Sequence, residues 1–232
     1  MAGPTDRPRQ LAFALPHRES LTRDNFLEGP SNELALALVD SWPDWPNRTM
    51  LLAGPEGTGK SHLAAIWAER SGARVVAAGT LSEAAVPATL STGAVVVEDL
   101  APEAMDERAM FHLMNMAREH GAFVLLTARA APATFAVGLR DLNSRLRAVT
   151  VIAITPPDDQ LFRALIVKFC TDRQMTVDET VVGYLATRIE RSVGAALETV
   201  ALLDAESLRL RRPVTRALAA EILRDDIAPR PE

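Results

Sequence analysis

The sequence predicts an α/β fold, in which a five-stranded parallel sheet is covered by helices on both faces and followed by a small all-helical domain. Three observations support this prediction. Short aliphatic runs alternate with helical patterns up to about residue 154, the runs lack polar alternation, and only helical periodicity follows Pro156 and Pro157. With 232 residues, 48% of them hydrophobic, the chain is long enough to bury a sizeable core.

The predicted elements follow from the order of these patterns. The five aliphatic runs expected to form strands span residues 49–53, 74–78, 94–98, 122–127 and 149–154. A first helix is expected after Ser31 or Asn32, which are suited to cap it. Further helices are expected at residues 60–71, 82–90, roughly 103–120 with Gly121 as C-cap, and roughly 137–146.

The chain is expected to divide into four segments. Residues 1–21 are rich in proline, arginine and polar residues, which predicts a flexible arm, and residues 22–156 form the α/β domain. The ITPPDDQ stretch joins this domain to a helical domain over residues 157–226, and residues 227–232 form a tail. The sequence contains no internal repeat.

Composition argues against several classes of function. A net charge of −5 disfavours a general nucleic-acid coat, although local basic patches stay open. No apolar run approaches the ~20 residues that span a bilayer and no secretory signal is recognised, so we expect a cytoplasmic protein without a membrane partner. The 4 histidines lack the spacing of a zinc site, and the single cysteine, Cys170, lies in an apolar helical stretch typical of a buried core.

A phosphate-binding motif is the strongest chemical signal. GPEGTGKS matches G-x-x-x-x-G-K-[ST] between a strand-like run and a helical pattern. Its glycines let backbone N–H groups approach phosphate oxygens, Lys60 would contact the β- and γ-phosphates, and Ser61 would ligate Mg²⁺. The residues expected to bind ADP or ATP are Gly54, Pro55, Glu56, Gly57, Thr58, Gly59, Lys60, Ser61 and His62. A glycine-rich turn with an accidental lysine is the alternative. Lys60 is also one of only two lysines, the other being Lys168.

A pair of carboxylates follows on a later strand. AVVVEDL places Glu98 and Asp99 at the carboxyl end of its run, where ligands bind in open α/β sheets. We expect Glu98 to organise Mg²⁺ through water and Asp99 to polarise an attacking water. Glutamate before aspartate reverses the usual order, which predicts slow hydrolysis. A strand that ends at solvent with two charges is the alternative.

These motifs resemble those of AAA+ ATPases and, within that group, the DnaA replication-initiator family. NFLEGPSNELALAL resembles the segment ahead of the phosphate loop, which implies that Phe26 lies against adenine. LLTARAAPATF resembles the sensor 1 strand and implies a role for Thr127. GLRDLNSRLRAV resembles the arginine-finger box, which implies that Arg145 acts on the nucleotide of a neighbouring subunit. A surface arginine, in a run that also holds Arg140 and Arg147, is the alternative.

The resemblance covers about residues 22–225 and has two departures. The family's sensor 2 arginine would face the phosphates, but Gly194 aligns there, with Arg191 almost one turn away as a weaker substitute. This departure implies weak or absent intrinsic ATPase activity and leaves the choice between ADP and ATP open. A full initiator also continues into a helix-turn-helix DNA-binding domain, whereas this sequence stops at DDIAPRPE, so we do not expect it to read origin DNA.

An AAA+ core with an N-terminal arm resembles the Hda-type regulators, which inactivate DnaA. That family carries a clamp-binding peptide, and QLAFAL fits its pattern through Gln10, Leu11, Phe13 and Leu15. The resemblance implies binding of the sliding clamp, contact with DNA through the clamp, and stimulation by Arg145 of the hydrolysis of DnaA-bound ATP. The same stretch is alternatively the first strand of the core.

Two other functions stay open. One is a self-assembling AAA+ ATPase of the helicase-loader type, in which the chain forms a homo-oligomer and turns over ATP alone. The other is a non-catalytic adaptor that binds DnaA without stimulating hydrolysis. The rate of ATP turnover, with and without the initiator, distinguishes these functions from the regulatory one.

Overall fold

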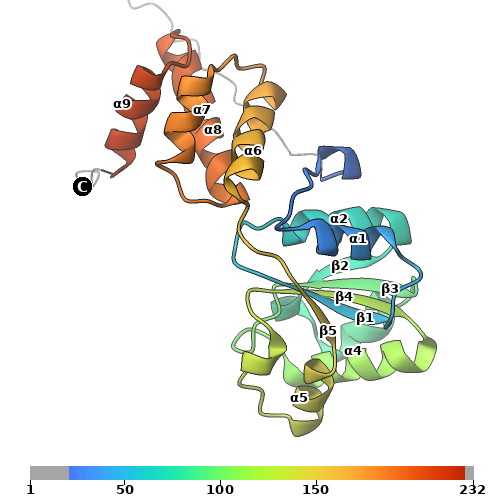
Figure 1. Cartoon of the computed structure of the whole chain (residues 1–232). Coiled ribbons are helices and arrows are strands. Elements are labelled where there is room, and N and C mark those ends of the chain that lie inside the picture. The colour runs from blue at the N-terminus through green and yellow to red at the C-terminus, as the bar shows by residue number, and fades with distance from the viewer. Residues whose placement is uncertain (1–20, 228–232) are drawn as a thin grey trace, which may run out of the picture.

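The computed structural model describes the backbone of residues 21–227 and the side chains of residues 21–224 (Figure 1). The expected clamp-binding residues Gln10, Leu11, Phe13 and Leu15 lie outside the described residues. Figure 1 shows an α/β part built around a sheet and a separate group of helices, joined by the chain that follows the last strand. This arrangement agrees with the predicted fold class.

Five parallel strands form the central sheet, as the aliphatic runs predicted. They are β1 (Thr49–Ala53), β2 (Arg74–Ala77), β3 (Ala94–Glu98), β4 (Phe123–Ala128) and β5 (Thr150–Ala153). Their order is β2-β3-β4-β1-β5, so β1 lies between β4 and β5. Because parallel strands end at the same edge, the loops after β1, β3 and β4 lie close together there.

Helices cover both faces of the sheet, because side chains along each strand alternate between two buried faces. Met50 and Leu52 of β1 belong to a cluster with the first two helices, whereas Leu51 belongs to a cluster with the next three. The first two are α1 (Glu33–Asp40) and α2 (Lys60–Ser71), and the next three are α3 (Val86–Thr89), α4 (Glu107–His120) and α5 (Arg140–Arg147).

Two predicted helices differ from the structure. The stretch expected as one helix over residues 82–90 forms a 3₁₀ turn, Glu83–Ala85, followed by the single turn of α3. Pro87 accounts for the break, because its ring and missing N–H exclude it from a helix interior. Helix α4 begins later than expected, at Glu107, because the Asp106 carboxylate accepts hydrogen bonds from two backbone N–H groups of its first turn.

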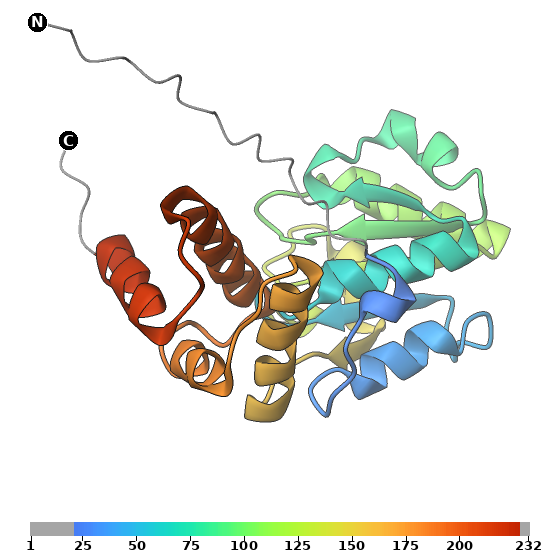
Figure 2. The same cartoon turned by 90° about the horizontal axis from the view of Figure 1, so that it is seen from above.

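Four helices follow β5 in the described part of the chain, and we call them the lid. They are α6 (Asp159–Asp172), α7 (Glu179–Ala186), α8 (Val193–Leu210) and α9 (Arg216–Ile227). Their apolar faces share a cluster of their own, which includes Phe162, Val182 and Leu203. Figure 2 shows α6 between the rest of the lid and the α/β part.

Cys170 lies on the buried face of α6, as the apolar stretch predicted. Burial raises the pKa of its thiol to about 11, so the side chain stays neutral and behaves as a small apolar residue. None of the helices within residues 21–227 is both long enough and apolar enough to cross a membrane.

Candidate functional site

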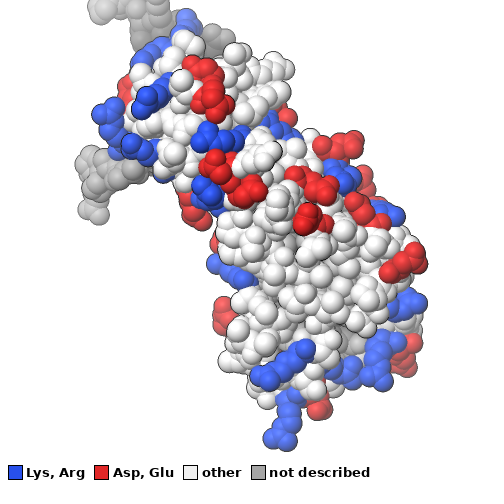
Figure 3. All heavy atoms as spheres, in the orientation of Figure 1, with Lys and Arg blue, Asp and Glu red and all other residues white. Residues whose placement is uncertain are grey.

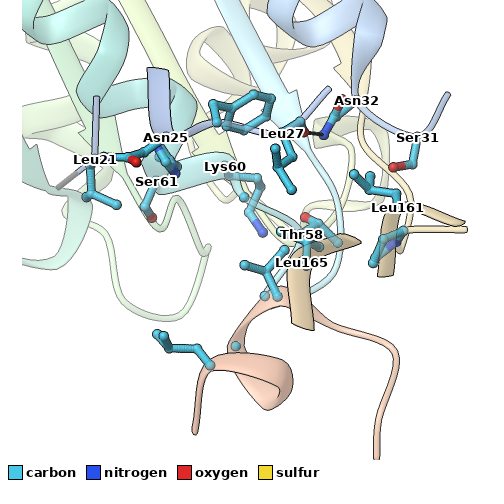
Figure 4. Close-up of a pocket in the computed structure, with 18 of the residues that line it drawn as sticks. Leu21, Asn25, Leu27, Ser31, Asn32, Thr58, Lys60, Ser61, Leu161 and Leu165 are labelled. Carbon is cyan, nitrogen blue, oxygen red and sulfur yellow. Dashed lines mark hydrogen bonds between the residues drawn. The ribbon is translucent and has the colours of Figure 1, made fainter. Parts of the chain in front are cut away.

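A cavity of about 580 Å³ lies between the α/β part and the lid, and its volume is in the usual range for small-molecule sites. Its walls come from the segment before α1, the phosphate loop, the ends of β3 and β4, and helices α6 and α8. Figure 4 shows Lys60 extending into the space between Thr58 and Leu165. The predicted nucleotide-binding residues that line it are Phe26, Glu56, Gly57, Thr58, Gly59, Lys60, Ser61 and His62.

The phosphate loop has a backbone conformation that depends on glycine at two positions. Gly57 has φ 70° and Gly59 has φ 92°, in the left-handed region that favours glycine. Gly59 is the N-cap of α2, so the first N–H groups of that helix, which lack partners within the helix, face the loop. Backbone N–H groups and a helix N-terminus together form an arrangement that binds phosphate.

Lys60 lies in the first turn of α2 and is almost fully buried. Its Nζ donates hydrogen bonds to the carbonyl oxygens of Gly54, at 2.8 Å, and Pro55, at 2.6 Å. Burial lowers the pKa of Lys60 from its ordinary value, and the nearby Asp99 carboxylate partly opposes this effect. A third donor of the ammonium group stays available to an anion in the cavity.

Asp99 and Glu98 are oriented differently. Asp99 lines the cavity and has φ 54°, and its N–H donates to the Thr127 hydroxyl at 3.0 Å. Glu98 is not among the lining residues, and its buried Oε1 has no hydrogen-bond partner within the described part of the protein. Of the predicted pair of carboxylates, Asp99 is therefore the one that lines the cavity, while the metal role of Glu98 stays a prediction.

Thr127 connects the ends of β3 and β4 through hydrogen bonds and is not among the residues that line the cavity. It is fully buried near the end of β4, and its carbonyl oxygen accepts the N–H of Leu100 at 2.8 Å. Together with the hydroxyl contact to Asp99, this bond fixes the chain as it leaves β3. The predicted sensor residue thus sets the backbone direction of a cavity-facing carboxylate.

Two charged pairs in the cavity wall were missed from the sequence. Arg129 follows β4 and forms an exposed ion pair with Glu56 of the phosphate loop at 2.7 Å. Lys168, on α6, pairs with Asp172 at 2.5 Å, and its side chain is 17% exposed. A signal existed for Arg129, because it lies just beyond a strand's carboxyl end, whereas no local pattern marks Lys168.

The lid contacts the phosphate loop directly. The N–H of Val193, at the start of α8, donates to the carbonyl oxygen of Gly57 at 2.6 Å. A Cβ atom on Gly57 would lie 2.9 Å from the Cβ of Ser192, so glycine permits this approach. Gly194 lines the cavity, whereas Arg191 forms an ion pair with Asp159 at 3.3 Å and is not among the lining residues.

The opposite wall is apolar and suited to a flat ring. Phe26 is buried and makes a T-shaped contact with the His62 ring, with centroids 5.2 Å apart. Leu27 and the lid residue Leu161 continue this wall. Asn32 holds the segment in place, because its side chain accepts from the N–H of Gly29 and donates to the carbonyl oxygen of Leu27.

Arg145 lies away from the cavity. It is half-buried on α5, and its guanidinium carbon is 5.1 Å from the centroid of the Phe111 ring. Arg145 is not among the residues that line the cavity, and Figure 1 shows α5 at the end of the molecule opposite the lid. The structure therefore separates the predicted arginine finger from the chain's own phosphate loop.

The cavity offers oxygen ligands of the kind that Mg²⁺ accepts. Ser61 and Asp99 both line it, and Mg²⁺ is commonly held by one or two protein oxygens together with substrate phosphates. Among the described side chains, residues 21–224, no group of three or more His, Cys, Asp or Glu would hold a metal ion unaided. The donor set fits Mg²⁺ that arrives with a phosphate ligand.

Comparisons with known proteins agree with this architecture. No protein-family model matches the sequence. It is 24% identical over 233 residues to the chromosomal replication initiator protein DnaA 2 of Chlamydia caviae, in an alignment that covers 89% of this chain and 49% of that protein. The chain thus spans about half the length of this curated relative, to which it is homologous.

Several solved structures share the fold. Domain III of the Thermotoga maritima replication initiation protein DnaA matches with a TM-score of 0.74 and 17% identity, over 90% of this chain and 98% of that one. AMPPCP-bound DnaA from Aquifex aeolicus matches with a TM-score of 0.66 and 19% identity, over 82% and 66%. The Thermotoga maritima RuvB Holliday junction branch migration motor matches with a TM-score of 0.72 and 15% identity, over 89% and 72%. The fold is the AAA+ fold of DnaA domain III.

Proposed function

We propose that this chain, a DnaA homologue with the AAA+ fold, is an Hda-like negative regulator of replication initiation that stimulates hydrolysis of DnaA-bound ATP. The observation that carries the proposal is the separation of Arg145 from the cavity. The guanidinium lies over Phe111 on α5, outside the residues that line the chain's own phosphate site. An arginine in that position is suited to a nucleotide held by another molecule.

In this proposal the cavity holds ADP or ATP. The phosphate loop and Lys60 would bind the phosphates, and the apolar wall at Phe26 would lie against adenine. Ser61 and a carboxylate at the end of β3 would hold Mg²⁺, which neutralises phosphate charge. Because the same cavity is lined by α6 and α8, bound nucleotide would fix the position of the lid relative to the α/β part.

The α5 surface would supply the catalytic charge to the initiator. Figure 3 shows Lys and Arg atoms gathered at the end of the molecule where Figure 1 draws α5, and that helix contains Arg140, Arg145 and Arg147. A guanidinium group keeps its charge and offers a planar set of donors to phosphate oxygens. In known systems an arginine supplied by a partner accelerates phosphoryl transfer by about 10³-fold or more.

The N-terminal arm is proposed to bind the sliding clamp through Gln10, Leu11, Phe13 and Leu15, and so to contact DNA indirectly. These residues lie outside the described part of the chain, so the sequence pattern alone supports this step. Tethering of this kind raises the local concentration of a weak second contact. Substituting Gln10, Leu11 and Phe13 with Ala should remove clamp binding without lowering the melting temperature, and a large loss of stability would favour the core-strand alternative.

A non-catalytic adaptor that binds DnaA is the second candidate, and the lid supports it. Gly194 lines the cavity where the resemblance implies an arginine, and Arg191 is paired with Asp159. Both observations favour weak or absent ATP hydrolysis by the chain itself. They count against the helicase-loader alternative, which requires robust turnover by a homo-oligomer.

The deciding experiment measures ATP turnover by purified DnaA on DNA loaded with the sliding clamp. Addition of the wild-type chain should accelerate turnover, and Arg145→Ala should abolish the acceleration. Arg140→Ala is a matched control, because Arg140 is exposed on the same helix without the contact to Phe111. A parallel assay without DnaA measures turnover by this chain alone.

Three outcomes separate the candidates. Acceleration that depends on Arg145 supports the regulator. Binding of DnaA without acceleration contradicts it and supports the adaptor. Turnover by the chain alone, at a rate comparable with that of other AAA+ motors, contradicts both and supports the helicase-loader type.

A further inference from the structure

Helix α5 is held at its start by a carboxylate from another helix. Glu107, in the first turn of α4, accepts hydrogen bonds from the backbone N–H groups of Gly138, at 2.7 Å, and Leu139, at 2.6 Å. Leu139 occupies the N-cap position of α5, and its own side chain makes no capping bond. These N–H groups belong to the N-cap residue and the residue before it, and the start of a helix attracts negative charge, so Glu107 fixes the chain where it enters α5.

The same face of α4 also contacts the other end of α5. Phe111 follows Glu107 by four residues, so the two side chains lie on one face of α4, about one turn apart. The Arg145 guanidinium carbon lies 5.1 Å from the centroid of the Phe111 ring. This distance is within the range of a cation–π interaction. One turn of α4 therefore contacts both the beginning and the functional arginine of α5.

The contacts of Glu107 and Phe111 add to the core packing that already holds α5 in position. Leu142 and Leu146 are buried and attach α5 to the hydrophobic cluster that it shares with α4 and the strands, which sets the rotation of the helix. A helix of 8 residues gains little stability alone, so its position depends on such neighbours. Burial of two leucines does not fix the conformation of a long arginine side chain at the surface. The ring of Phe111 restricts the conformation of Arg145.

Arg145 differs in this respect from the other arginines of α5. Arg147 donates from its Nε to the Asn143 side chain, within the same helix, and Arg140 is exposed. Of the cation–π contacts found within residues 21–224, one joins α5 to another helix, and it is that of Arg145 with Phe111. The guanidinium predicted to act on a partner is thus the one that a neighbouring helix supports.

We infer that Glu107 and Phe111 are positioning residues for Arg145, which orient its guanidinium before the partner binds. The inference rests on the proposed function, in which Arg145 acts on DnaA-bound ATP. A guanidinium that is already oriented loses less conformational freedom when it meets a phosphate. Loss of either contact should therefore lower the rate of stimulated hydrolysis rather than the affinity for DnaA.

The first test compares Phe111→Leu with Phe111→Tyr in the stimulated hydrolysis assay. Leucine keeps an apolar side chain but removes the aromatic face, so kcat should fall about 2- to 5-fold with KM for DnaA unchanged. Tyrosine keeps the ring face and should restore wild-type kcat.

Glu107→Gln should lower kcat by about twofold, because a neutral acceptor holds the two N–H groups less strongly. Glu119→Gln, exposed in the last turn of α4, is the control and should match wild type.

A second readout needs no partner. In ¹H–¹⁵N spectra of the full chain, the Arg145 Nε–Hε resonance, assigned by its disappearance in Arg145→Lys, should be shifted upfield by the Phe111 ring. The upfield shift should persist in Phe111→Tyr and disappear in Phe111→Leu. Thermal melting of each variant controls for loss of the fold.

The results distinguish the inference from the function on which it rests. A wild-type chain that shows the ring-current shift but does not stimulate DnaA would contradict the proposed function and leave the contact established. A wild-type chain that stimulates DnaA, together with a folded Phe111→Leu variant of unchanged kcat, would overturn the positioning role. Absence of the ring-current shift in the wild-type chain would also overturn it.

Discussion

The cavity and α5 both present positive charge, but the two regions differ in how that charge is held. Lys60 is almost fully buried, donates to two backbone carbonyl oxygens and is surrounded by segments from both parts of the molecule. Arg145 is half-buried at the surface and lies against one aromatic ring. In the proposed function this difference is expected, because a site that encloses its own ligand needs many convergent residues, whereas an arginine that acts on another molecule needs to be oriented at the surface.

Substitution of Lys60 should produce the largest effect and should test whether the two regions are independent. Lys60→Met removes the charge that faces the phosphates, so ADP affinity should fall about 10- to 100-fold, as measured by calorimetry. Because burial disfavours the charged form of Lys60 in the folded protein, the melting temperature without nucleotide should not fall. Arg145→Ala should leave ADP affinity within about twofold of wild type. Equal losses in both variants would contradict the separation of the two regions.

The contrast also explains what the sequence reveals. The glycine spacing of the phosphate loop indicated its backbone conformation, because Gly57 and Gly59 both adopt the left-handed φ that favours glycine, although the predicted residues Gly54 and Pro55 do not line the cavity. The five strands were predicted within a residue or two, since fully buried parallel strands form continuous aliphatic runs. Features that arise from interactions between residues close in the sequence can therefore be predicted from the sequence.

Contacts between segments far apart in the chain could not be predicted from the sequence. Nothing near Lys168 in the sequence indicates that α6 turns it toward the cavity, and nothing near Glu107 indicates that it fixes the chain where it enters α5. The turn of Asp99 toward the cavity, with Glu98 outside its lining, depends on a hydrogen bond to Thr127, 28 residues away. Such features depend on tertiary packing, which a single sequence does not encode in a local pattern.

The contact between lid and phosphate loop should be the next most sensitive feature. Gly57→Ala places a methyl group 2.9 Å from Ser192 at a left-handed φ of 70°, so we expect a loss of about 1 to 2 kcal/mol in unfolding free energy. ADP affinity should also fall, because the lid would move away from the loop. Chemical denaturation and calorimetry measure the two effects.

A matched control lies across the same contact. A Cβ atom on Gly194 would approach no atom more closely than 3.9 Å, which is ordinary van der Waals contact. Gly194→Ala should therefore leave stability and ADP affinity near wild type. Equal destabilisation by both alanines would show that the close approach at Gly57 is not the cause.

Substitution of Lys168 should have a smaller effect on ADP affinity. It tests whether the lid contributes positive charge to the cavity. Lys168 lines the cavity, but its ammonium group is already paired with Asp172, so its interaction with a ligand is shared. Lys168→Met should weaken ADP binding about 2- to 5-fold without altering stimulation of DnaA at saturating nucleotide. Asp172→Asn is the companion variant and should leave ADP affinity unchanged or raise it, because the lysine loses its competing partner. Weaker binding in Asp172→Asn would assign the carboxylate a direct ligand contact instead.

Arg191 should give the smallest effect, and its substitution tests the last link between lid and cavity. The resemblance to DnaA leaves Arg191 as a substitute for the arginine missing at Gly194, but the structure pairs it with Asp159 on the lid, in an exposed position. Exposed ion pairs contribute little to stability, and an arginine held there has no contact to lose in the cavity. Arg191→Ala should therefore change ADP affinity by less than about twofold, whereas Gly194→Arg, which adds a guanidinium inside the cavity wall, should raise ATP affinity severalfold. A large loss of ADP affinity in Arg191→Ala would mean that Arg191 leaves Asp159 when nucleotide binds. The cavity would then, like α5, depend on an arginine that lies at the surface of the protein.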